Sequence, residues 1–155
     1  VYAKTKQMAA LLASAREEQL LHKEYLAIVK GRFEEQSGTL TYTLGKEKGI
    51  RGRSVTVDGQ NCITNYEVII EGNFFSLIKV HIETGRLHQI RAGMAYFGHP
   101  LIGDRLYGGS MHAMKRPALH CWKVEFIHPK TKKQIKIECK LPDDMQKVVD
   151  RLQEK

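Results

Sequence analysis

Apolar and polar residues alternate along much of the chain, as they do in strands that bury one face. Gly38–Leu44 alternates leucine and tyrosine with threonine over its whole length. Lys23–Lys30 is rich in β-branched and aromatic residues and stops at Gly31, which predicts another strand. Four further strands are predicted, at Asn61–Glu71, Phe74–Glu83, Pro117–His128 and Gln134–Lys140. Gly72-Asn73 predicts a hairpin turn between the first two of these.

Helical spacing of apolar residues predicts three helices. Thr5 can cap the first, which fades near Glu18, and Gly98 ends the second, Leu87–Phe97. Asp143 suits the first turn of the third, which continues over Met145–Leu152. The apolar stripes are Met8, Leu11, Leu12 and Ala15 in the first helix and Leu87, Ile90, Met94 and Phe97 in the second. Strands outnumber helices and come as hairpins, so we predict one α+β domain with a mainly antiparallel, mixed sheet flanked by helices.

The charge balance favours a polyanionic partner. The 155 residues include 25 Lys and Arg against 17 Asp and Glu, a formal net charge of +8. RNA or DNA is the first expectation and an anionic membrane surface the second, with a basic protein of no such partner as the alternative. Gly45–Gln60 is predicted to be a mobile basic loop that either grips a sugar-phosphate backbone or is merely solvated. Its cations are Lys46, Lys48, Arg51 and Arg53.

Several classes of protein are disfavoured. No apolar run approaches the roughly 20 residues of a membrane span, and we expect no export signal. Cys62, Cys121 and Cys139 have no C-x-x-C spacing, which favours reduced thiols in a cytoplasmic protein. The histidines show no H-E-x-x-H spacing, so no metal site is predicted.

Polar residues concentrate at the start of the second predicted helix. Arg91 lies beside its apolar stripe, and a partly buried guanidinium requires an anionic partner, either functional or in a structural ion pair. Arg86, His88 and Gln89 lie in the first turn, where they either bind phosphate or cap the helix and hold the Thr84-Gly85 turn. Tyr25 is either a core residue of its strand or a platform on which a nucleobase stacks.

The same region carries a resemblance to a known family. Glu83–Arg91 reads E-T-G-R-L-H-Q-I-R, and Gly98–Asp104 with Leu106–Gly108 reads G-H-P-L-I-G-D and L-Y-G. This ordered run resembles the RluA-type RNA pseudouridine synthases. Other segments agree in sequence order: Lys23–Gly31 (K-x-Y-x-A-x-V-x-G), Thr64 with Tyr66, and Leu119-His120 followed by Phe126 and His128-Pro129.

The resemblance implies a pseudouridine synthase-like fold that isomerises a uridine in ribosomal or transfer RNA. The base is flipped into a pocket, detached from the ribose at nitrogen, turned and rejoined through carbon, without cofactor or metal. Tyr25 would lie against the flipped base and assist proton removal from its C5. Arg91 would pair with the catalytic aspartate, and Leu119 would pack beside the pocket. Which uridine is modified, and the oligomeric state, stay open.

The chain departs from the family pattern in two ways. Gly93 replaces the usual histidine, which would loosen the helix or open room beside Arg91. The family's catalytic aspartate lies in H-R-L-D-x-x-T-S-G, and the residues that follow that motif resemble Val1–Thr5. No aspartate of this chain has a matching context, and Asp104 is interpreted as part of a structural loop. Residues 1–155 are therefore expected to be the C-terminal part of a catalytic domain, truncated on its N-terminal side and inactive alone.

A rival from another class is a non-catalytic RNA-binding module with the same fold. The residues encoded upstream of Val1 discriminate the two, since an R-L-D motif there supports the enzyme. A basic DNA-binding domain is the weaker third possibility, because no helix-turn-helix or zinc-finger signature is present.

Overall fold

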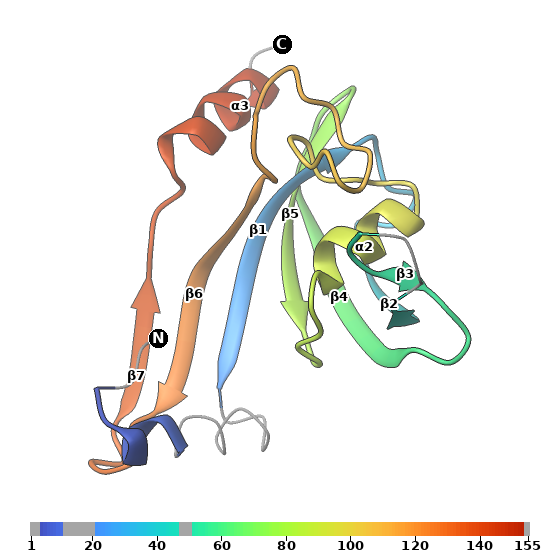
Figure 1. Ribbon diagram of the computed structural model, residues 1–155. Coiled ribbons are helices and arrows are strands. Elements are labelled where there is room, and N and C mark those ends of the chain that lie inside the picture. Colours follow the sequence, from blue (N-terminus) through green and yellow to red (C-terminus); the bar gives the residue numbers. More distant parts are fainter. Residues whose placement is uncertain (1–3, 11–20, 47–50, 154–155) are drawn as a thin grey trace.

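A seven-stranded antiparallel sheet organises the chain, with helices on its two faces (Figure 1). The computed structural model describes residues 4–10, 21–46 and 51–153. The strands are β1 (His22–Lys30), β2 (Ser37–Gly45), β3 (Ser54–Val55), β4 (Gln60–Glu71), β5 (Phe75–Ile82), β6 (Leu119–Ile127) and β7 (Gln134–Glu138). The helices are α2 (Gln89–Tyr96) and α3 (Asp143–Gln153), and residues 6–10 form a further helical turn. The α+β class and the antiparallel sheet are confirmed.

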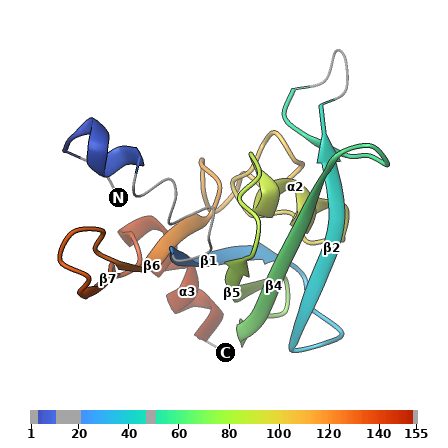
Figure 2. The same ribbon diagram turned by 90° about the horizontal axis from the view of Figure 1, so that it is seen from below.

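The strands lie in the order β3-β2-β4-β5-β1-β6-β7. The hairpin between β4 and β5 closes where Gly72 N–H donates to Phe75 O at 2.9 Å, as the Gly72-Asn73 pair predicted. Seen from below, β2 and β4 turn strongly away from β6 and β7, so the sheet is markedly twisted (Figure 2). Antiparallel pairing places the start of β1 beside the end of β5, next to the turn that leads to α2.

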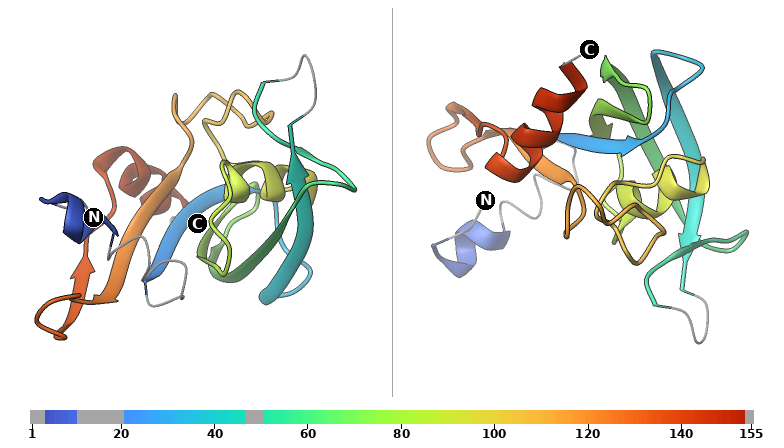
Figure 3. Two further views of the ribbon diagram at one scale, coloured as in Figure 1. Left: turned by 60° about the horizontal axis from the view of Figure 1, so that its bottom comes forward. Right: turned by 90° about the horizontal axis from the view of Figure 1, so that it is seen from above.

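Each face of the sheet has its own apolar core, and the two helices lie on opposite faces (Figure 3). On the α2 face, Ile90 and Met94 pack against Ala27, Val29, Ile78 and Val80. On the α3 face, Met145, Val148 and Val149 pack against Ile28 and Leu77. Burying side chains of this size contributes about 1.5–3 kcal/mol each, which fixes both helices on the sheet.

An irregularity between β1 and β6 decides which residues of β6 face α2. Tyr25 pairs with Cys121 and Glu24 with Lys123, so one residue of β6 is unpaired between them. Residues that pair across an antiparallel sheet share a face, and consecutive residues lie on opposite faces. Cys121 therefore lies on the face of Tyr25, whereas Lys123 lies on the face of Glu24, 3.7 Å from its carboxylate.

The first predicted helix is described only at its start, and the second is shorter than predicted. Thr5 caps the first helical turn, since its Oγ1 accepts the Met8 N–H at 3.1 Å, but Leu11, Leu12 and Ala15 lie outside the described residues. Helix α2 is shorter than the predicted Leu87–Phe97. Leu87 is 57% exposed and Phe97 39% exposed, so only the middle of the predicted stripe is buried.

Within the predicted mobile loop, Ser54 and Val55 form the short strand β3. They pair with the end of β2, which orders the loop on that side.

Candidate active site

The turn between β5 and α2 is held from inside by Gln89. Its side-chain amide donates to Ile63 O at 3.1 Å and to Thr64 Oγ1 at 2.9 Å. Its carbonyl oxygen accepts from the Thr84 hydroxyl at 2.8 Å and from the Arg86 N–H at 3.0 Å. These four bonds use all the bonding positions of the amide, and the residue is 2% exposed. Of the two roles predicted for Gln89, phosphate binding and holding the Thr84-Gly85 turn, the structure favours the second.

His88 forms the N-cap of α2 in a left-handed backbone conformation, with φ of 56°. Its side chain does not cap the helix. Instead, Nδ1 lies 2.8 Å from the Tyr107 hydroxyl. Burial, and next the nearby Arg91 guanidinium, lower the pKa of His88, against the opposing effect of Asp104. A neutral imidazole at neutral pH follows.

Arg91 forms a two-point ion pair with Asp104. Nε and Nη2 donate to the two carboxylate oxygens at 2.8 and 2.9 Å. The side chain of Asp104 is 0% exposed and that of Arg91 is 21% exposed. The hydrogen bonds to Asp104 raise the pKa of Arg91. Within the described residues Arg91 thus has the structural ion pair given as one of its two alternatives, and Asp104, assigned to a structural loop, is the partner. Its pairing with the catalytic aspartate of the family stays a prediction.

The space that Gly93 leaves free is occupied by Tyr42. A Cβ at this position would overlap the hydroxyl and ring of Tyr42. That hydroxyl donates to Gln89 O at 2.8 Å and lies 2.8 Å from Thr64 Oγ1. Burial raises the pKa of Tyr42 to about 12, so the phenol stays protonated. The missing side chain lets α2 approach β2 closely.

A pocket of about 730 Å³ opens where β1 begins and β5 ends. Tyr25 lines it, flanked by two cations, Lys23 and Arg86, and by the Thr84-Gly85 turn. Arg86 also donates from Nε to Asn61 O at 3.0 Å, which directs its stem along the end of β4. The pocket therefore combines an aromatic ring with two cations and the carboxylate of Glu83 at one end of the sheet.

Leu119 lies on β6 diagonally from Tyr25. Leu119 pairs with Ala27 and Cys121 pairs with Tyr25, so all four side chains share one face. Tyr25 and Leu119 both pack against the apolar core under α2, which includes Ile90, the neighbour of Arg91. The structure thus brings Tyr25, Leu119 and the start of α2 to one side of the sheet. Of the predicted site residues that the structure describes, only Tyr25 and Arg86 line the pocket itself.

The basic loop contributes three described cations. Lys46 and Arg51 are exposed, and Lys48 lies outside the described residues. The backbone N–H of Arg53 donates to the Tyr107 hydroxyl at 2.9 Å, so the loop is attached near α2. Sequence reasoning did not select Tyr107, although it belongs to the L-Y-G part of the family pattern.

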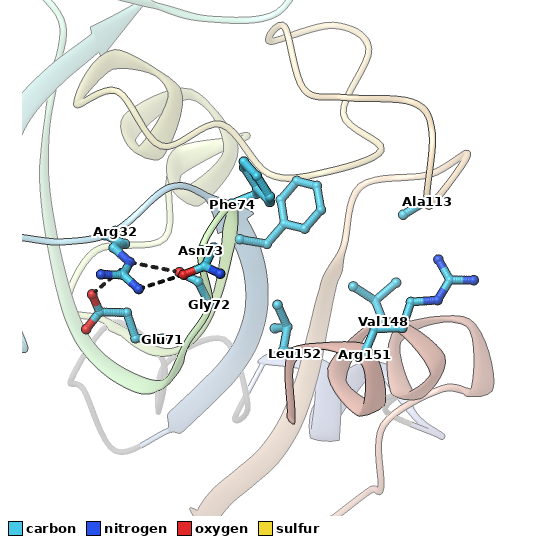
Figure 4. A pocket seen from close by; sticks show the side chains of 10 residues that line it. Arg32, Glu71, Gly72, Asn73, Phe74, Ala113, Val148, Arg151 and Leu152 are labelled. Carbon is cyan, nitrogen blue, oxygen red and sulfur yellow. Dashed lines mark hydrogen bonds and ion pairs between the residues drawn. The ribbon is translucent and has the colours of Figure 1, made fainter. Parts of the chain in front are cut away.

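A second cavity, of about 570 Å³, lies between the β4–β5 turn and α3 (Figure 4). Arg32 closes one side by donating to Gly72 O at 3.2 Å and to Asn73 Oδ1 at 2.9 Å. Phe74 projects beside it and is 77% exposed, while Leu152 of α3 lines the other side. None of the predicted site residues in the described ranges lines this cavity.

The described residues contain neither a cluster of metal ligands nor a membrane-spanning helix. No group of three His, Cys, Asp or Glu side chains in the described part of the chain could hold a metal ion. Among the same residues, no helix is long and apolar enough to cross a membrane.

Comparisons with known proteins agree with this architecture. The family model described as RNA pseudouridylate synthase matches residues 1–96. A Bacillus subtilis protein described as the uncharacterized RNA pseudouridine synthase YjbO is 39% identical over 141 residues, covering 90% of this chain and 50% of that protein. The ribosomal large subunit pseudouridine synthase D of Blochmanniella floridana is 33% identical over 144 residues, covering 82% of this chain and 45% of that protein.

The fold is also found in a solved structure. Human RNA pseudouridylate synthase domain containing 1 superposes with a TM-score of 0.77 at 20% identity, covering 99% of this chain and 74% of that one. The twisted antiparallel sheet of this chain is thus the fold of a pseudouridylate synthase domain. This chain belongs to the RluA-type RNA pseudouridine synthase family. It spans about half the length of the curated relatives that it matches.

Proposed function

We propose that this chain is the C-terminal part of the catalytic domain of an enzyme that converts specific uridines in structured ribosomal or transfer RNA to pseudouridine. The chain as given would be inactive alone, because the nucleophilic aspartate of the family pattern is not among its residues. The coverage of about half of each curated relative supports this division.

The pocket beside Tyr25 carries the proposal. Its volume of about 730 Å³ lies in the range of small-molecule sites, roughly 300–1,000 Å³, and admits a single nucleotide. The ring of Tyr25 offers a face for a flipped base, and Lys23 and Arg86 offer positive charge to its phosphates. A base outside the duplex is the form in which an enzyme can reach its ring atoms.

The chemistry assigns separate roles to these residues. Breaking the bond between ribose and uracil nitrogen and forming the bond to C5 requires a nucleophile, which a carboxylate outside this chain would supply. Tyr25 would hold the detached base and assist the loss of the C5 proton. Arg91 would orient the incoming carboxylate while Asp104 keeps its guanidinium in place, and Leu119 would exclude water from the same side.

Two proteins test this division of labour. The 155-residue chain should bind a uridine-containing RNA stem-loop and produce no pseudouridine. A protein extended by the residues encoded upstream of Val1 should produce it when incubated with ribosomal or transfer RNA. Conversion by the 155-residue chain would contradict the proposal. RNA binding without conversion by the extended protein would favour the non-catalytic RNA-binding module.

Tyr25→Phe in the extended protein is the sharpest single variant. It keeps the ring and removes the hydroxyl, so the rate of conversion should fall while the affinity for RNA is retained. Arg91→Ala should abolish conversion, but it also leaves Asp104 buried without its partner, so its folded fraction has to be measured alongside. A fully active Arg91→Ala enzyme would refute the role given to Arg91.

The cationic rim is tested separately by RNA affinity. Arg86→Ala should weaken binding and lower the slope of log K against log salt by about one, as expected for one phosphate contact. Arg116→Ala is the matched control, because Arg116 is an exposed arginine paired with Asp144 on the α3 side. Equal effects of the two substitutions would argue against the pocket.

A further inference from the structure

Tyr107 joins three segments that are far apart in the sequence. It lies in the loop between α2 and β6. Its hydroxyl lies 2.8 Å from Nδ1 of His88 at the start of α2 and accepts the Arg53 N–H at 2.9 Å. Its ring lies 5.2 Å from the Arg91 guanidinium carbon, and its own N–H donates to Asp104 Oδ1 at 3.4 Å. One side chain therefore links the basic loop to the Arg91–Asp104 ion pair.

The two contacts of the hydroxyl are chemically compatible. A phenol has one hydrogen and can also accept. Because the oxygen accepts from Arg53, its own hydrogen is available to donate to His88 Nδ1, which requires that nitrogen to be unprotonated. The lowered pKa of His88 agrees with this arrangement.

The loop backbone is shaped to meet this hydroxyl. Gly52, which precedes Arg53, has a φ of +79°, a conformation that side chains rarely adopt. A Cβ there would lie 2.5 Å from the Tyr107 hydroxyl and 3.0 Å from Leu106 Cδ2. The close approach and the hydrogen bond are therefore parts of one contact.

We propose that Tyr107 is a positioning residue for RNA binding. It fixes the described part of the basic loop at Arg53, so that Arg51 and Arg53 are already in place when the phosphodiester backbone of the RNA arrives. The inference rests on the proposed function, since it takes RNA as the ligand. A loop that is fixed before binding loses less conformational freedom when RNA arrives, so the affinity is higher for the same charges.

Tyr107→Phe in the 155-residue chain tests the proposal with two measurements. The first is hydrogen exchange of the Arg53 amide, which should become at least about tenfold faster when its acceptor is removed. The second is the affinity for a uridine-containing RNA stem-loop, measured by fluorescence anisotropy at several salt concentrations. The dissociation constant should rise about three- to tenfold while the salt slope stays unchanged, because no cation is lost.

Two further variants make the result specific. Tyr96→Phe removes a hydroxyl from a 63% exposed tyrosine at the end of α2 and should change neither measurement. Gly52→Ala should displace the loop from the other side and weaken RNA binding to a similar extent, although the Tyr107 hydroxyl is kept. The melting temperature of each variant is measured as well, so that RNA binding and hydrogen exchange are compared only between folded proteins.

The outcomes separate this inference from the proposed function. Unchanged exchange at Arg53 in Tyr107→Phe would overturn the contact itself. Faster exchange with an unchanged dissociation constant, or a reduced salt slope, would overturn the positioning role while leaving the proposed function intact. A wild-type chain that binds no RNA would refute the proposed function, and the role of Tyr107 in RNA binding with it.

Discussion

The two faces of the sheet are covered by helices of different kinds. Helix α3 is held by apolar side chains, and its main ion pair, Arg116–Asp144, has side chains 44% and 45% exposed. Helix α2 is also held by apolar side chains, but a buried polar network surrounds its start, with Gln89 2% and Asp104 0% exposed. A buried polar group destabilises the fold unless it has hydrogen-bond partners. The stability of the α2 side therefore depends on specific hydrogen-bond geometry, whereas that of the α3 side depends mainly on apolar packing.

Replacing the ion-paired arginine should reveal the largest difference in stability between the two faces. Arg91→Ala leaves the Asp104 carboxylate buried without its partner and should lower the free energy of unfolding by about 3–5 kcal/mol. Arg116→Ala removes an exposed pair with similar two-point geometry and should cost at most about 1 kcal/mol. Urea denaturation of both variants measures the difference. Similar losses would show that burial does not distinguish the pairs.

Loss of core volume should affect both faces alike. Met94 under α2 and Met145 in α3 are both 0% exposed. Substitution of either by alanine should cost about 2–5 kcal/mol, since each leaves a cavity of similar size. Thermal unfolding of the two variants tests this. A much smaller loss for Met94→Ala would mean that the polar network, rather than apolar packing, holds α2 in place.

Gly93→Ala tests the close approach of α2 to β2. In a solvated helix this change stabilises by about 1 kcal/mol, because glycine is a poor helix former. Here the new methyl group overlaps Tyr42, so the protein should lose about 1–3 kcal/mol. Ala95→Gly, in the same helix, is the control for propensity alone. Stabilisation by Gly93→Ala would show that Tyr42 can move aside.

Acid should weaken the α2 face before the α3 face. The pKa of His88 is lowered from 6.5, so as the pH falls below about 6.5 the unfolded chain binds this proton before the folded one. The contribution of His88 to the free energy of unfolding is therefore fully present above that pH and is lost as the pH falls through the pKa of His88 in the folded protein. On the α3 face, Arg116 lowers the pKa of Asp144 from 3.8. The contribution of Asp144 to the free energy of unfolding is therefore lost only below about pH 3.8.

Unfolding measured between pH 7 and pH 5 tests the His88 contribution. His88→Asn should flatten the pH dependence, because asparagine tolerates the left-handed conformation and does not titrate in this range. His112→Asn, in an exposed part of the loop before β6, should leave the profile as in the wild type. An unchanged profile in His88→Asn would assign the dependence to another group.

The sequence by itself determined six of the described strands, all except β3, together with the β4–β5 hairpin and helix α3. Their signals are local: alternation in Gly38–Leu44, the Gly72-Asn73 turn, and the acidic first turn and apolar stripe of α3. The ordered motif around Arg91 also indicated the family, which the comparisons confirmed. Each of these inferences needs only residues that are neighbours in the chain.

Tertiary structure alone decided how the polar residues of that motif are used. Helix α2 begins at Gln89 because His88 takes a left-handed conformation and contacts Tyr107, a residue 19 positions away. Gln89 faces β4 rather than solvent, and Arg91 pairs with Asp104. A polar side chain near a helix start can bind a ligand or satisfy a buried neighbour. Which it does depends on groups that only the folded chain brings within hydrogen-bonding distance.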